Sequence, residues 1–182
     1  MSKAFLVLDD GRIFEGNTWG AEGRTFGEAV FATGMTGYQE TLTDPSYHKQ
    51  VVVMTAPHIG NTGWNLEDNE SSKIWVSGFV VRNPSPITSN WRATEDLENE
   101  LKTQGIVGIS GVDTRALTRH LRDRGAMRVG IFSGEELSRE EMVIEVRKME
   151  QMSGSFLSED VSTSENYTVQ APSKRFNVVA LD

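Results

Sequence analysis

Residues 107–132, VGISGVDTRALTRHLRDRGAMRVGIF, contain the pattern that decides the fold. Branched apolar residues at the two ends of this stretch predict two β-strands, 107–109 and 127–132. Between them, Asp113 is a typical N-cap residue and Gly125 a typical C-terminal stop, so we expect a helix from one to the other. A strand, a helix and a further strand in succession predict an α/β fold built of layers.

The first half of the chain supplies most of the remaining strands. Residues 4–8 and 12–16 flank an Asp-Gly pair, which favours the tight turn of a β-hairpin. Stretches rich in branched or aromatic residues predict three more strands, at 29–33, 50–54 and 74–81. Strands that are entirely apolar are expected in the centre of a sheet, covered on both faces.

Two further helices are predicted on either side of the deciding stretch. Thr94 is expected to cap a helix whose Leu97 and Leu101 face the core. Ser138 and Glu141 form the pattern of a capping box at the start of the other helix. The predicted helices are thus fewer than the strands and fall mostly in the second half of the chain.

The composition changes after residue 150, and this change predicts the domain organisation. Residues 1–150 are expected to form one domain, and 151–175, which are polar and without periodicity, a linker. Residues 176–182, FNVVALD, have the composition of a buried strand but no partner in the sequence. We expect them to begin a second domain, so that the chain is a fragment of a longer protein.

Composition excludes several classes of function. The chain has 182 residues, a net charge of −8 and no cysteine, so it contains no thiol nucleophile, disulfide or cysteine-ligated metal. Its three histidines are far apart in the sequence, and no metal site is expected. Apolar runs fall far short of the ~20 residues of a membrane span, and the N-terminus has no signal-peptide pattern. We expect a cytoplasmic protein that does not contact membranes.

Basic residues are concentrated in the predicted helix after Asp113. Arg115, Arg119 and Arg122 stand at i, i+4 and i+7, which places them on one face. This face has three interpretations: a solvated surface, pairing with carboxylates of the same or another subunit, or a nucleic-acid patch. The acidic net charge and the lack of aromatic residues among the arginines disfavour nucleic acid.

Two glycine-rich loops, 34–40 and 57–63, directly follow predicted strands, where backbone amides can approach a ligand. Neither contains a phosphate-binding fingerprint, and each taken alone is typical of an ordinary turn. Pro45 predicts a further turn, with Ser46 exposed on it. Ser46 and His48 have no evident carboxylate partner, so no catalytic triad is expected.

Four motifs occur in a fixed order along the chain. They are GEAVFATGMTGYQE at 27–40, TDPSY at 43–47, PHIGN at 57–61 and GVDTRALTR at 111–119. Together they resemble the N-terminal domain of the small subunit of glutamine-dependent carbamoyl phosphate synthetase. The resemblance extends from about residue 4 to residue 150, and 177–182 resembles the first strand of the glutaminase domain of that family.

This resemblance implies a layered β/β/α domain with mixed sheets and about three to four helices. It also implies that a class I amidotransferase domain with a Cys–His pair hydrolyses glutamine and passes ammonia through a tunnel to a large subunit. There, bicarbonate and ATP would yield carbamoyl phosphate for arginine and pyrimidine synthesis. The implied partners are the large subunit in a heterodimer, glutamine, and the chain's own glutaminase domain. No cofactor is expected in this chain, with ATP and Mg on the large subunit.

The resemblance carries over few site residues. No catalytic residue transfers, because the Cys–His domain is missing, and the chain alone is expected to be inactive. Ser46 matches the family serine that reaches toward bound glutamine. An alternative is a stand-alone binding or scaffold module derived from this domain. The remaining candidates are Gly34, Met35 and Thr36 for the ammonia path, and Arg115, Arg119 and Arg122 for subunit or domain contacts.

Overall fold

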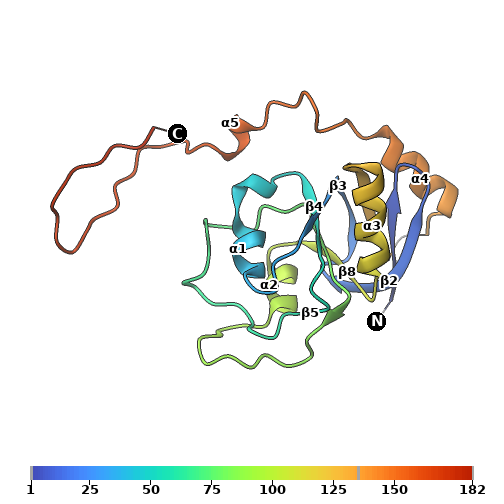
Figure 1. Cartoon of the computed structure of the whole chain (residues 1–182), viewed down its shortest axis with the longest axis horizontal. Coiled ribbons are helices and arrows are strands. Elements are labelled where there is room, and N and C mark those ends of the chain that lie inside the picture. Colours follow the sequence, from blue (N-terminus) through green and yellow to red (C-terminus); the bar gives the residue numbers. More distant parts are fainter. Residues whose placement is uncertain (1, 135, 182) are drawn as a thin grey trace.

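The chain is described by a computed structural model that covers residues 2–134 and 136–181. Among these residues, seven strands form a closed barrel and two more form a short pair (Figure 1). The pair consists of β5 (His58–Ile59) and β7 (Asn83–Pro84). The barrel strands are β1 (Lys3–Leu8), β2 (Ile13–Gly20), β3 (Gly23–Ala32), β4 (Gln50–Met54), β6 (Gly78–Val80), β8 (Val107–Ser110) and β9 (Met127–Ser133).

The barrel is a mixed sheet with the order β1-β2-β8-β6-β4-β3-β9. Strands β8, β6, β4 and β3 run parallel to one another. The other four pairs, β1–β2, β1–β9, β2–β8 and β3–β9, are antiparallel. The predicted α/β class with a mixed sheet is confirmed. The sheet also closes on itself, because β9 pairs with β3 on one side and with β1 on the other.

Helices pack against the barrel from several sides. Helix α2 contacts β2 and β8, α3 contacts β3 and β4, and α4 contacts β9 and β1. A 3-10 turn, Pro45–Tyr47, follows α1. The helix bounds are α1 (Tyr38–Thr43), α2 (Leu97–Thr103), α3 (Thr114–Arg124), α4 (Arg139–Lys148) and α5 (Ser158–Val161).

Alternate strand residues face different apolar cores. In β4, Val51 and Val53 belong to a central cluster to which all seven barrel strands contribute, while Val52 and Met54 face a second cluster. Helix α3 adds its buried Leu117 to the central cluster. The second cluster lies under α1 and α2, and a third lies under α4. The apolar strand sequence is therefore buried on both faces, as expected.

The predicted hairpin and central strands are confirmed, with changes in length. Strands β1 and β2 pair around a tight turn in which the Leu8 amide donates to the Arg12 carbonyl at 2.9 Å and Gly11 has a φ of 94°. The strand predicted over 74–81 is too long, and only Gly78–Val80 is a strand. The residues before it turn toward α1, where the Trp75 amide donates to the Leu42 carbonyl.

The helix predictions are right for α3 and α4 and partly wrong elsewhere. Asp113 caps α3 and Ser138 forms a capping box on α4. Thr94 does not cap α2; the cap is Asp96, whose carboxylate accepts from the Asn99 amide at 2.9 Å, while Thr94 bonds to the loop at Trp64. Helix α1 was not expected, because no side chain caps it and Gly37, at a φ of 79°, precedes it.

The C-terminal part of the described chain leaves the barrel. Figure 1 shows residues after α4 crossing over the domain, with α5 on the way, and then extending beyond it as an arm. Residues 162–181 are exposed. The strand predicted over 176–182 is not formed at 176–181, and residue 182 lies outside the described residues.

Candidate functional site

The turn after α1 presents Ser46 to solvent. Pro45 fixes the backbone at the start of the 3-10 turn, and the Asp44 carboxylate accepts from the Ser46 amide at 2.8 Å. The His48 amide closes the turn by donating to the Pro45 carbonyl at 3.0 Å. No described residue bonds to the Ser46 hydroxyl, and the residue is exposed as predicted. The hydroxyl is thus held on a firm turn and is available to another molecule.

The turn is anchored on its N-terminal side by buried Thr43 at the end of α1. The Thr43 hydroxyl donates to the Gln39 carbonyl at 2.9 Å and accepts from the Glu70 amide at 2.9 Å. Ser71 donates to the Thr43 carbonyl at 2.6 Å. Because Thr43 is fully buried, these bonds fix the point from which the turn leaves the domain.

His48 has a carboxylate partner, contrary to the expectation from the sequence. Its Nε2 lies 3.2 Å from an oxygen of Asp160 in α5, and its ring meets Trp75 edge-on. Asp160 is 112 residues away along the chain, so no local pattern signals this contact. The described contacts include no bond between the Ser46 hydroxyl and His48, so they do not link Ser46, His48 and Asp160 as a triad.

The candidate ammonia-path residues Gly34, Met35 and Thr36 lie in the exposed loop between β3 and α1. Met35, an apolar side chain, is 86% exposed. Helix α1 separates this loop from Ser46, and its six residues span about 9 Å. Neither of the two cavities described below is lined by these three residues. Their assignment therefore still rests on the resemblance.

The second half of the same motif is a buried polar anchor that the sequence analysis missed. The Gln39 side chain donates to the carbonyl of Asn65 and to the Asn69 side chain, and accepts from the Asn65 amide. The Tyr38 hydroxyl donates to the Gly63 carbonyl at 2.6 Å and accepts from Thr62. Burial raises the pKa of Tyr38. These contacts fasten the loop after β5 to α1.

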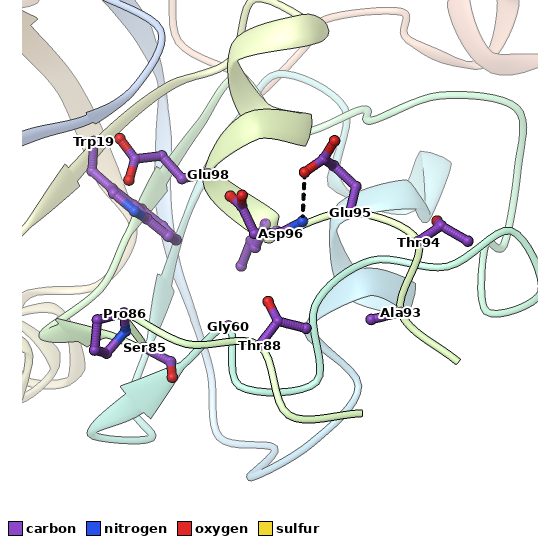
Figure 2. Close-up of a pocket in the computed structure, with 11 residues that line it drawn as sticks. Trp19, Gly60, Ser85, Pro86, Thr88, Ala93, Thr94, Glu95, Asp96 and Glu98 are labelled. Atoms are coloured by element: carbon purple, nitrogen blue, oxygen red, sulfur yellow. Dashed lines mark hydrogen bonds between the residues drawn. The ribbon is translucent and has the colours of Figure 1, made fainter. Parts of the chain in front are cut away.

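Figure 2 shows a cavity of about 500 Å³ beside the N-terminus of α2, also missed from the sequence. Buried Trp19 lines the cavity, together with three acidic residues at the start of α2, Glu95, Asp96 and Glu98. The carboxylates already have partners: Glu95 accepts from the Asp96 amide at 2.9 Å, and Glu98 pairs with Lys102 at 2.7 Å. A hydrogen bond from the Asn99 side chain, with a second from the Asp96 amide, lowers the pKa of Glu95.

A smaller cavity of about 370 Å³ lies where the chain leaves α4. Arg128 stands at its edge, donating to the carbonyls of Arg147 at 3.0 Å and Met149 at 2.9 Å and pairing with Asp9. Met152 lines the cavity on the linker side and its sulfur lies 3.9 Å from the Gln50 side chain. The start of the linker therefore contacts the β3–β4 edge of the barrel.

The arginine face of α3 is exposed. Arg122 lies 3.5 Å from exposed Asp123, a geometry that contributes little to stability. Among the described residues, no ion pair joins Arg115 or Arg119 to a carboxylate. The described part of the chain therefore supplies no carboxylate for these two arginines, and it favours a solvated face or a contact with another molecule.

The described part of the chain contains neither a candidate metal site nor a candidate membrane-spanning helix. No group of three or more His, Asp or Glu side chains there could hold a metal ion. None of its helices combines the length and the apolar content that crossing a bilayer requires.

Known proteins similar to this chain agree on one family. Residues 6–131 match the model of the carbamoyl-phosphate synthase small chain, CPSase domain. The carbamoyl phosphate synthase small chain of Streptomyces coelicolor is 67% identical over 181 residues, which are 98% of this chain and 48% of the relative. The small chain of Mycobacterium tuberculosis is 58% identical over 189 residues, which cover 100% of this chain and 50% of the relative. The chain thus spans about half the length of the curated relatives it matches.

Proposed function

Because this chain belongs to the family of carbamoyl-phosphate synthase small chains, we propose that it is the N-terminal domain of a small subunit that supplies ammonia for carbamoyl phosphate synthesis. In this function, the other half of the small subunit hydrolyses glutamine. The observation that carries the proposal is the 67% identity to the Streptomyces coelicolor small chain, which extends over nearly the whole of this chain.

The role of this chain is to bind and to position, without forming covalent bonds. Class I glutamine hydrolysis requires a cysteine thiolate, and the sequence contains no cysteine. The exposed hydroxyl of Ser46 can donate one hydrogen bond to the carboxylate of glutamine bound in the other half. This proposal is supported by the hydrogen-bonded turn, which holds Ser46 in place while its hydroxyl has no described partner. Gly34, Met35 and Thr36 border the route of ammonia in the same proposal.

The partner is a large subunit, to which the arginine face of α3 offers an exposed basic surface. The large subunit would bind ATP and Mg and convert bicarbonate and ammonia into carbamoyl phosphate, in a cytoplasmic heterodimer that serves arginine and pyrimidine synthesis. Relatives named as small chains support such a partnership. A basic helix in a chain of net charge −8 is suited to a specific acidic surface.

A chimera tests the proposal. The matching half of the Streptomyces coelicolor small chain is replaced by this sequence, and the chimera is expressed in a strain that lacks its own small chain. We expect growth without added arginine and pyrimidine. A control lacking the replaced half should not grow. A chimera that is produced and binds the large subunit but never supports growth would contradict the proposal.

A further inference from the structure

One carboxylate of the linker, that of Asp160, contacts the residues that follow the Ser46 turn. Asp160 in α5 accepts a hydrogen bond from the Lys49 ammonium at 3.0 Å, and the same oxygen lies 3.2 Å from His48 Nε2. Hydrogen bonds from Lys49, and then from His48, lower the pKa of Asp160. One side chain of the linker is therefore bound by two consecutive residues that directly follow the turn.

Lys49, which directly follows the turn, has an unusual backbone conformation next to this contact. Lys49 has a φ of 60°, the only positive value at a non-glycine residue among those described. His48 is held by its edge-on contact with Trp75, at 5.3 Å between ring centres. A non-glycine residue keeps such a conformation only where its surroundings favour it.

The chain that leaves α4 contacts the barrel at two earlier points, one at the end of the helix and one at the start of the linker. Arg128 holds the carbonyls of Arg147 and Met149 at the end of α4, and Met152 lies against Gln50 at the start of β4. Asp160 makes a third contact farther along the chain, and residues 162–181 are exposed and extend away from the barrel (Figure 1). The path from α4 to α5 therefore follows the β3–β4 edge and ends beside the turn.

We propose that Asp160 is a positioning residue that fastens the linker to His48 and Lys49, so that the chain after residue 161 starts from a fixed point beside Ser46. An effect of Asp160 on glutamine binding rests on the proposed function, in which the half of the small subunit that follows the linker lies against Ser46. The fastening itself does not depend on it.

Limited proteolysis of this 182-residue chain tests the fastening. Asp160→Asn removes the carboxylate, and Glu159→Gln is a matched control, because Glu159 is an exposed neighbour in the same helix without a described partner. Since exposed ion pairs are weak, we expect Asp160→Asn to speed cleavage within 150–161 about fivefold, without changing the melting temperature. Glu159→Gln should leave cleavage unchanged.

Lys49→Gln gives a second check. If the contact is real, Asp160→Asn combined with Lys49→Gln should be cleaved no faster than Asp160→Asn alone, because both changes break the same contact. Additive effects, or no effect of Asp160→Asn, would overturn the proposal.

The consequence is tested in the complete small chain bound to its large subunit. We expect Asp160→Asn to raise the KM for glutamine about threefold with a smaller change in kcat, Asp160→Glu to restore part of the loss, and Glu159→Gln to have no effect. If Ser46→Ala raises this KM and Asp160→Asn does not, the positioning role is wrong and the proposed function stands. If neither does, the glutamine contact of Ser46 is wrong, and the proteolysis result alone decides whether the linker is fastened.

Discussion

A single exposed hydroxyl, that of Ser46, carries the proposed contact with glutamine. A hydrogen bond to a charged acceptor contributes roughly 1.5–3 kcal/mol, so in the complete enzyme Ser46→Ala should raise the KM for glutamine about ten- to hundredfold. The change in kcat should be smaller, and synthesis from ammonia should be unaffected. Steady-state kinetics with both nitrogen sources measure this. Ser72→Ala, at another exposed serine, is the control. An unchanged KM would make Ser46 a purely structural residue.

The hairpin turn is joined to α3 through Asp10 and His120. His120 Nε2 lies 2.7 Å from Asp10, and Arg12 lies 3.1 Å from the other ring nitrogen. Partial burial opposes ionisation of Asp10, but hydrogen bonds from the Arg12 amide and His120 outweigh it and lower the pKa of Asp10 below 3.8. This stabilisation is complete above that ordinary pKa and is lost as the pH falls through the lowered one.

We therefore expect Asp10→Asn to reduce the free energy of unfolding by about 1 kcal/mol at neutral pH and by less below pH ~3.8. Urea denaturation at a series of pH values measures this difference. A loss that stays constant down to pH ~2 would show that ionised Asp10 does not supply the stabilisation.

Residue-level features were predictable where they are local. The turn around Pro45 and the exposure of Ser46 follow from backbone chemistry within a few positions, so the sequence sufficed. Asp160 and His48 are 112 residues apart in the sequence, and no local pattern near either residue predicts their contact. Gln39 was missed for the same reason, since its partners lie in a distant loop.

Among the elements, α3 has the clearest capping signal. The Asp113 carboxylate accepts from the Ala116 amide at 3.0 Å, so Asp113→Ala should lower the free energy of unfolding by about 1 kcal/mol. Asp123→Ala is the control, because a carboxylate near the C-terminus of a helix is unfavourable and its loss should be neutral or slightly stabilising. Urea denaturation of both variants decides. Equal losses would mean that capping does not account for the effect.

Helices and strands were predicted well where caps or apolar runs are strong. Strand β4 matches its predicted range, 50–54, because its run of valines is continuous. Helix α1 was missed because tertiary contacts of Tyr38 and Gln39 stabilise it without caps. The sequence predicts Thr94 as the cap of α2 because Thr is a good N-cap residue. In the structure, Asp96 forms the capping hydrogen bond.

At the scale of the whole molecule, the arginine face of α3 is exposed, and among the described residues no ion pair joins Arg119 to a carboxylate. Arg119→Ala should therefore change the free energy of unfolding by less than about 0.5 kcal/mol while weakening association with the large subunit. Lys102→Ala, at an exposed basic residue of α2, is the control for association. Calorimetric titration and urea denaturation measure the two effects. Salt-sensitive binding to duplex DNA that is lost in Arg119→Ala would instead support a nucleic-acid surface.

Closure of the barrel could not be predicted from the sequence. The pattern of strands and helices defines the α/β class, but β9 pairs with both β1 and β3 over large separations in the chain. Hydrophobic periodicity shows which faces are buried and does not show which strands are neighbours.

The most direct test of the account is the nitrogen source used by a reconstituted enzyme. A complete small chain containing this sequence is titrated into its large subunit, and carbamoyl phosphate formation is measured with glutamine and, separately, with ammonia. We expect the large subunit alone to form carbamoyl phosphate from ammonia. The rate with glutamine should rise as the small chain is added and then saturate. These 182 residues alone should not hydrolyse glutamine. A complex that forms but stays dependent on ammonia, or glutaminase activity in the cysteine-free chain, would contradict the account.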